Sequence, residues 1–145
     1  MKNKQIIFVC TGNTCRSPMA EVILKSKIKL AEIKGIKVSS AGLCAHEGKP
    51  MNEFSKIALK KLGYRTRAFK SKPLTPELVK KADLIICMTE EHKAYLNGLS
   101  KAVTMDEITG LGNIADPYGL GLPAYIKASQ EIESACDVII REIKG

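Results

Sequence analysis

The sequence predicts a single α/β domain in which four parallel strands form a twisted sheet with helices on both faces. Short runs of β-branched and apolar residues alternate along the chain with segments whose apolar residues recur at helical spacing. The first strand, the first helix and the second strand follow one another closely, which predicts a right-handed parallel crossover. In such a fold, ligands bind beyond the carboxyl ends of the strands.

The amino-terminal half begins with residues 5–9, whose β-branched and aromatic side chains are typical of a buried strand. Pro18 suits the first turn of a helix, which we expect to continue until Gly35 stops it. Residues 36–40 alternate between apolar and polar side chains and form the second predicted strand. Asn52 is a suitable N-cap for the helix that follows.

The second half contains the most apolar predicted strand, residues 84–88, which we expect to be buried on both faces. Thr75, which is followed by Pro and Glu, begins a helix before this strand. The rest of the chain is predicted to contain a helix capped by Thr89, a fourth strand over 102–105, a glycine-rich loop over 106–123 and a C-terminal helix over 126–143.

The composition is that of an ordinary globular protein, with one domain over residues 1–145. The net charge of +8 calls for a nucleic-acid partner to be considered, but the lysines are scattered and only 5% of the residues are aromatic. We therefore expect no nucleic-acid partner; the charge attracts anionic substrates or keeps the surface soluble. Because no apolar segment approaches the roughly 20 residues of a membrane helix or resembles a signal peptide, we expect a cytoplasmic protein with no membrane partner.

The five cysteines are widely spaced, and no Cys-x-x-Cys pair or Cys/His cluster has the spacing of a zinc site. We therefore expect no metal ion, and thiols rather than structural disulfides. Cys87 lies in a predicted strand and Cys136 on the apolar face of the last helix, so both are predicted core residues. The full set is Cys10, Cys15, Cys44, Cys87 and Cys136.

The loop that joins the first strand to the first helix predicts an anion site, since backbone N–H groups and the positive end of a helix dipole converge there. A thiol at its base, Cys10, loses its proton readily and can attack a bound anion. Arg16 offers a planar guanidinium to two phosphate oxygens, and Ser17 can hydrogen-bond the sulfur. The predicted phosphate-binding loop consists of Thr11, Gly12, Asn13, Thr14, Cys15, Arg16 and Ser17.

Two loop residues are expected to allow unusual backbone conformations. Gly12 permits a positive φ, and Asn13 tolerates the left-handed region while its side-chain amide hydrogen-bonds within the loop.

Phosphoryl transfer also needs a proton for the leaving group. Asp116 is the predicted acid, although an Asp-Pro pair also starts ordinary turns. Asp83 and Asp106 are weaker candidates.

The motifs CTGNTCRSPMAE at 10–21, SSAG at 39–42 and DPY at 116–118 resemble those of the low-molecular-weight protein tyrosine phosphatase family, in the same order and over nearly the whole chain. The resemblance implies the four-stranded phosphotyrosine protein phosphatase I-like fold, no metal, no cofactor and a two-step mechanism through a phosphocysteine. Phosphorylated proteins would be the substrates, and we expect a monomer. The implied roles are nucleophile for Cys10, phosphate clamp for Arg16, acid and then base for Asp116, and loop support for Asn13, Ser17 and Ser40.

Within that family, the loop resembles the bacterial protein-arginine phosphatase branch more closely than the tyrosine-directed members. That branch carries threonine where Thr14 stands, whereas tyrosine-directed relatives usually carry a branched aliphatic residue; the hydroxyl changes polarity rather than size. His46 stands where tyrosine-directed members place an aromatic wall, and Gly119, after Tyr118, where they often carry a second aromatic residue. We expect a protein-arginine phosphatase, with a protein-tyrosine phosphatase as the alternative.

Two features depart from this pattern or allow two interpretations. Phe69 stands near the position where family members often carry a histidine bonded to the asparagine network, so the support of the loop is expected to differ. Cys15 is either a packing residue or, as the resemblance favours, the partner of Cys10 in a reversible disulfide that would make the enzyme redox-regulated.

Two rival functions use the same scaffold. A thiol-dependent arsenate reductase would need a further redox-active cysteine pair, for which Cys87 is the only nearby candidate and lacks a close partner. An inactive phosphate-binding module would be expected only if one of the three catalytic candidates were replaced, and all three are present.

Overall fold

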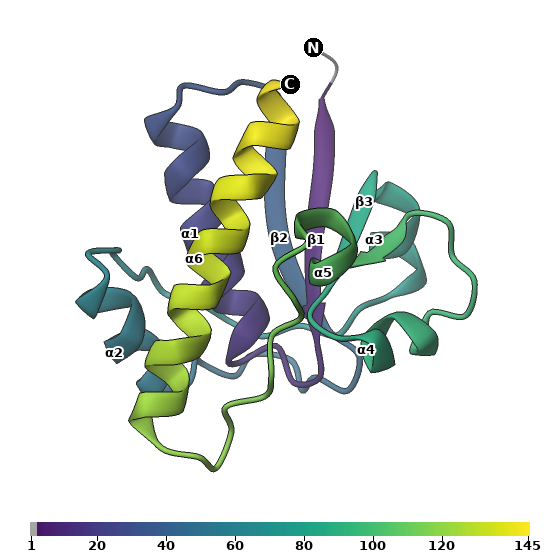
Figure 1. Cartoon of the computed structure of the whole chain (residues 1–145). Coiled ribbons are helices and arrows are strands. Elements are labelled where there is room, and N and C mark those ends of the chain that lie inside the picture. Colours follow the sequence, from purple (N-terminus) through teal and green to yellow (C-terminus); the bar gives the residue numbers. More distant parts are fainter. Residues whose placement is uncertain (1–2) are drawn as a thin grey trace.

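A computed structural model describes residues 3–145 as a four-stranded sheet flanked by helices (Figure 1). The strands are β1 (Lys4–Cys10), β2 (Ile36–Gly42), β3 (Leu84–Cys87) and β4 (Ala102–Thr104). Their order in the sheet is β2-β1-β3-β4, and every neighbouring pair is parallel. The predicted α/β fold with four parallel strands is confirmed.

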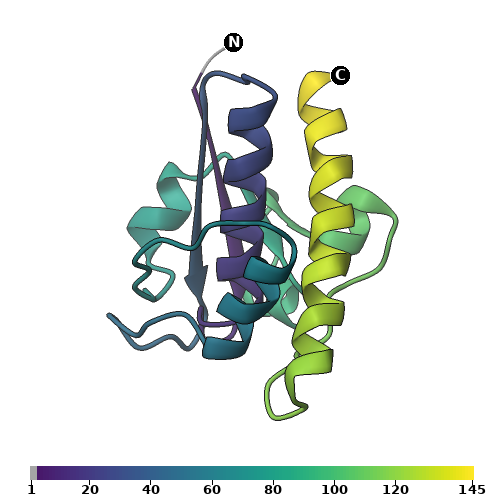
Figure 2. The same ribbon diagram turned by 90° about the vertical axis from the view of Figure 1, so that its left-hand side faces the viewer.

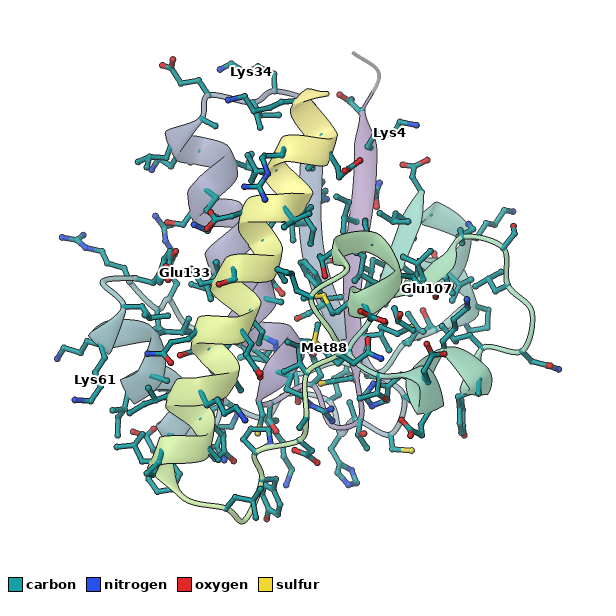
Figure 3. All side chains as sticks on the ribbon, in the orientation of Figure 1. Lys4, Lys34, Lys61, Met88, Glu107 and Glu133 are labelled. Atoms are coloured by element: carbon teal, nitrogen blue, oxygen red, sulfur yellow. The ribbon has the colours of Figure 1, made fainter. Side chains whose placement is uncertain are left out.

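The strand register brings the carboxyl ends of all four strands to one edge of the sheet. Cys10 pairs with Gly42, and Val9 pairs with Cys87, which in turn pairs with Thr104. The loops that leave these strands therefore meet at this edge, the lower one in Figure 1. Lys4 marks the far edge of the sheet in Figure 3.

Helices cover both faces of the sheet, as predicted. Figure 2 shows α1 (Arg16–Leu30) and α6 (Leu122–Lys144) side by side along one face. The same side carries α2 (Glu53–Lys61) and α5 (Met105–Thr109), whereas α3 (Pro76–Lys81) covers the other face and α4 (Glu90–Tyr95) follows the carboxyl end of β3. Among residues 3–145, no helix has the length and apolarity that crossing a membrane requires.

Two hydrophobic cores flank the sheet because successive side chains of a strand point to opposite faces. Phe8 belongs to the larger core, beneath α1 and α6, whereas Val9 belongs to the smaller core beneath α3. Both are fully buried, which explains the continuous apolar run of the first strand. Cys87 and Cys136 are buried in the smaller and larger cores respectively, as predicted.

The helix starts follow local capping rules, except that α1 and α6 have no side-chain cap. The side-chain oxygens of Asn52, Thr75 and Thr89 each accept a hydrogen bond from a backbone N–H of the next turn, at 2.8, 3.2 and 3.3 Å, which confirms the three predicted caps. Helix α1 begins at Arg16, which places Pro18 in its first turn as predicted, and its N-cap residue Cys15 makes no side-chain capping bond. The first N–H groups of α1 therefore have no cap.

The predicted loop over 106–123 is wrong at both ends, because residues up to 109 form helix α5 and α6 begins at Leu122. Thr104 and Glu107 form a capping box: each backbone N–H donates to the other side chain at 3.0 Å. Met105, predicted to end the fourth strand, therefore begins this helix instead. Met88 was likewise predicted inside a strand but follows β3, buried at the centre of the molecule (Figure 3).

Candidate active site

The loop between β1 and α1 is held in place through its carbonyl groups. The carbonyls of Cys10, Thr11 and Thr14 accept hydrogen bonds of 2.8–2.9 Å from backbone N–H groups in the segment 43–52 that follows β2. Within the described part of the chain, the N–H groups of residues 11–15 donate to no protein acceptor. With the uncapped start of α1, these N–H groups form a set of donors suited to a phosphate-like anion.

Asn13, rather than Gly12, takes the left-handed backbone conformation, so the prediction for Gly12 is wrong. The φ of Asn13 is 54°, which its short polar side chain tolerates. A Cβ atom on Gly12 would meet nothing nearer than Thr14 Oγ1 at 3.7 Å. The tertiary hydrogen bonds of Asn13 explain why the strained position falls there: its buried amide oxygen accepts from the N–H of Lys72 at 3.0 Å.

The Asn13 side-chain amide links the active loop to α1 and β2 through two serine hydroxyls. Its Nδ2 donates to Ser17 Oγ and to Ser40 Oγ, both at 2.9 Å. Since Ser17 Oγ accepts from Asn13, its own O–H is free to donate to Cys10 Sγ, 2.8 Å away. A hydroxyl directed at the sulfur stabilises negative charge on it.

Glu21 extends this network, and sequence analysis assigned it no role. The Ser40 hydroxyl donates to Glu21 Oε1 at 2.6 Å, and Lys25 Nζ donates to Glu21 Oε2 at 2.7 Å. The Ser40 hydroxyl is the donor because an ionised carboxylate can only accept. The only signal in the sequence was that Glu21 closes the motif at residues 10–21.

Arg16 and Asp116 are brought together over the loop. The Arg16 side chain is buried and donates from Nη1 to the carbonyl oxygen of Ile114 at 3.0 Å. Its Nη2 lies 3.8 Å from Asp116 Oδ2, on a side chain that is 55% exposed. Asp116 Oδ1 also accepts from the N–H of Tyr118 at 3.1 Å, so the Asp-Pro pair does start a turn. That turn leaves the other carboxylate oxygen directed toward Arg16.

His92 supports the other side of the loop, a role that sequence analysis missed. Its Nε2 lies 3.0 Å from Thr11 Oγ1 and its Nδ1 lies 3.1 Å from Thr89 Oγ1, so the ring bridges the loop and the start of α4. Burial of the ring, followed by the positive charge of Arg16, lowers the pKa of His92 to about 4. The bridge is therefore made by a neutral imidazole at neutral pH.

Cys15 is a buried free thiol whose sulfur lies 3.5 Å from the hydroxyl of Tyr125 on α6. Burial raises the pKa of the Cys15 thiol. Cys10 is also a buried free thiol, whereas Cys44 is exposed. Among residues 3–145, no three His, Cys, Asp or Glu side chains are grouped so that they could hold a metal ion.

The three predicted specificity residues occupy different surroundings. Thr14 is half-buried in the loop, with Oγ1 3.9 Å from Cys15 Sγ. His46 is exposed after β2 and Tyr118 is 72% exposed beside Asp116; the ring of His46 makes no hydrogen bond within residues 3–145. Phe69 is half-buried and packs against the larger core, so the Asn13 network is completed by the backbone of Lys72 instead of a histidine.

Residues 5–145 match the model of the low molecular weight phosphotyrosine protein phosphatase family. The chain belongs to this family. Its relatives include the protein-arginine-phosphatase of Bacillus subtilis (strain 168), which is 37% identical over 150 residues, with 96% of each chain covered.

Solved structures of the family show the same fold. A low molecular weight protein tyrosine phosphatase from T. tengcongensis superposes with a TM-score of 0.90 and 38% identity, covering 97% of this chain and 99% of that one. A YwlE arginine phosphatase, in a serine variant whose active-site serine is phosphorylated, gives a TM-score of 0.90 at 34% identity and covers 97% and 95%. This phosphatase family thus includes proteins named for both phosphoarginine and phosphotyrosine chemistry.

Gly42 of the phosphatase should be required for the closed loop. A Cβ atom at this position would lie 2.6 Å from Thr11 O and 2.9 Å from Asn13 N, so Gly42→Ala should displace the loop backbone. We expect a loss of about 1–3 kcal/mol in the free energy of unfolding. The Gly12→Ala variant serves as the control, and its unfolding free energy should change by less than about 0.5 kcal/mol. Equal stability of the two variants would contradict the close approach.

Stability should depend on pH through His92. Its folded-state pKa of about 4 lies below its ordinary value, so the folded protein favours the neutral ring. The neutral ring therefore contributes up to about 3 kcal/mol to the free energy of unfolding. This contribution is complete above about pH 6.5 and is lost as the pH falls toward 4. Urea unfolding of the parent and of His92→Gln should show a steeper pH dependence for the parent in this window. Parallel curves would contradict the neutral bridge.

Proposed function

We propose that this chain is a protein-arginine phosphatase that works through a phosphocysteine on Cys10. The observation that carries the proposal is the contact between Ser17 Oγ and Cys10 Sγ, 2.8 Å apart, inside a loop whose N–H groups at residues 11–15 have no acceptor within residues 3–145. The nucleophilic sulfur of Cys10 is thereby placed where a phosphoryl group would be bound. Membership of the phosphatase family supports this reaction class.

In the first step, Cys10 Sγ attacks the phosphorus atom, the S–P bond forms, and the bond from phosphorus to the substrate nitrogen breaks. Asp116 donates a proton to the departing guanidine nitrogen. In the second step, Asp116 takes a proton from water, the water oxygen bonds to phosphorus, and the S–P bond breaks to release inorganic phosphate. Arg16 and the loop N–H groups balance the charge of the transferred phosphoryl group.

The position of Arg16 supports its role as phosphate clamp. One guanidinium nitrogen is anchored on the Ile114 carbonyl, so the group is held rigidly while its remaining N–H donors stay available. Its second nitrogen faces Asp116 at 3.8 Å, which keeps the proposed acid close to the phosphate position. The exposure of the Asp116 carboxylate suits a group that meets both the leaving group and water.

Thr14 supports phosphoarginine as the substrate group. Its hydroxyl gives the loop a polar side chain where a branched aliphatic residue would favour an aromatic ring. The relatives named protein-arginine-phosphatase, which align over nearly the whole chain, agree with this assignment. We expect phosphorylated proteins as substrates and a monomeric, cytoplasmic enzyme.

Phosphotyrosine in proteins is the alternative substrate group, because other relatives are named protein-tyrosine-phosphatases. Arsenate reduction fits less well. It needs a second redox-active thiol pair, whereas Cys87 is fully buried and its burial raises its pKa to about 12.

The Asp116→Asn variant should be impaired in the chemical steps and not in substrate binding. We expect kcat on a substrate with a poor leaving group to fall by about 10² to 10⁴, because the variant cannot donate the proton that we assign to Asp116. Steady-state kinetics on phosphoarginine peptides measures this loss, with Asp106→Asn as the matched control. Full activity of Asp116→Asn, or an equal loss in Asp106→Asn, would contradict the assignment.

Substrate choice should move with Thr14. Replacing Thr14 with Ile removes the hydroxyl, so the ratio of kcat/KM for phosphoarginine peptides to that for phosphotyrosine peptides should fall by about tenfold or more. The exposed Thr66→Ile change is the control and should leave the ratio unchanged. An unchanged ratio in Thr14→Ile would refute the specificity argument.

Cys15 should protect Cys10 against oxidation. Peroxide converts the Cys10 thiolate to a sulfenic acid, which condenses with the Cys15 thiol to give a disulfide and water; dithiothreitol then restores both thiols. The parent should recover its activity after this treatment, whereas Cys15→Ser should not, and Cys44→Ser should behave like the parent. The idea fails if Cys15→Ser recovers as fully as the parent.

A further inference from the structure

A second concave site lies on the outer side of α1, away from Cys10. The cleft has a volume of about 670 Å³ and is formed between α1 and the segment 63–69. Figure 2 shows the chain after α2 crossing in front of α1. The half-buried ring of Phe69 provides an apolar wall.

The lining of the cleft is strongly cationic. Lys25 and Lys29 lie one helical turn apart on α1, and Arg65 and Arg67 face them from the crossing segment. Among residues 3–145, no carboxylate forms an ion pair with Lys29, Arg65 or Arg67. Three positive charges without acidic partners therefore surround a space of small-molecule size.

The single carboxylate in the cleft, Glu21, is already neutralised. Its Oε2 pairs with Lys25 Nζ at 2.7 Å, and its Oε1 accepts from Ser40, which belongs to the Asn13 network of the active loop. Lys25 is thus shared: it lines the cleft and it balances the charge of Glu21. An anion that draws Lys25 away leaves an uncompensated carboxylate on the network that orients the Ser17 hydroxyl toward Cys10.

We propose that this cleft binds an oligophosphate anion, held by Lys29, Arg65, Arg67 and Lys25, and that the bound anion competes with Glu21 for Lys25 and so lowers turnover. An oligophosphate matches the cleft because its charges are spaced along a chain, as the cations are, and guanidinium groups bind phosphate oxygens in pairs. A free oligophosphate and a nucleoside triphosphate share this chemistry; the latter would add a base to pack on Phe69.

Binding is measured by titration calorimetry with tripolyphosphate and, separately, with ATP. The protein is saturated with vanadate, so that the active loop is occupied and cannot account for the signal. We expect binding by the parent that weakens as salt is added, and an affinity lower by about tenfold or more in Arg65→Ala/Arg67→Ala. Tighter binding of ATP would identify a contribution from Phe69, and equal binding would identify the phosphate chain alone; both support the site.

The control variant removes two charges elsewhere. Lys80→Ala/Lys81→Ala changes the net charge equally on α3, at the opposite face of the sheet, and should bind like the parent. The proposal is overturned if vanadate abolishes binding or if Arg65→Ala/Arg67→Ala binds as tightly as the parent. Because this titration requires no turnover, its result is independent of the proposed phosphatase reaction.

A kinetic measurement tests separately whether the bound anion competes with Glu21 for Lys25. At saturating substrate, tripolyphosphate should lower kcat of the parent, because competition at the active loop alone would raise only KM. The kcat of Arg65→Ala/Arg67→Ala should be insensitive to the same concentration. Binding in the cleft with an unchanged kcat in the parent would overturn the competition for Lys25.

Discussion

The amide of Asn13 is the group on which the active loop depends. It is fully buried, and its oxygen and nitrogen are bonded to the backbone of Lys72 and to the hydroxyls of Ser17 and Ser40. A buried amide that lost these partners would be costly, so the loop, β2 and the segment before α3 are held in one arrangement. The same network includes the Ser17 hydroxyl that contacts Cys10, so the residues that support the loop also contact the nucleophile.

Much of this arrangement could be predicted from the sequence. Periodicity indicates the strands and helices, and the spacing of Cys10, Arg16 and the Asp-Pro pair indicates the site, because strand ends in a parallel sheet meet at one edge. His92 could not be found this way, since its partner Thr11 lies 81 residues away and only the fold joins them. The left-handed conformation of Asn13 agrees with the expectation from its short polar side chain, whereas the expected positive φ at Gly12 is absent.

Few charged groups lie between the active loop and the cleft that is formed by α1 and the segment 63–69. Arg16 is buried between the carbonyl of Ile114 and Asp116, close to the phosphate position, whereas the other cations lie on the surface. Glu21 lies between the two regions, bonded to Ser40 on one side and to Lys25 on the other. Glu21 therefore connects the active loop with the cleft that we propose binds an oligophosphate.

Direct detection of the covalent intermediate tests the central claim, that Cys10 attacks phosphorus from within this network. The Asp116→Asn variant is mixed with an aryl phosphate whose leaving group needs no acid, quenched in denaturant during turnover, and mapped by peptide mass spectrometry. The account predicts one phosphoryl group, on Cys10, that is absent from Cys10→Ala. A phosphoryl group on Ser17 or His92, or turnover with no labelled residue, would contradict it.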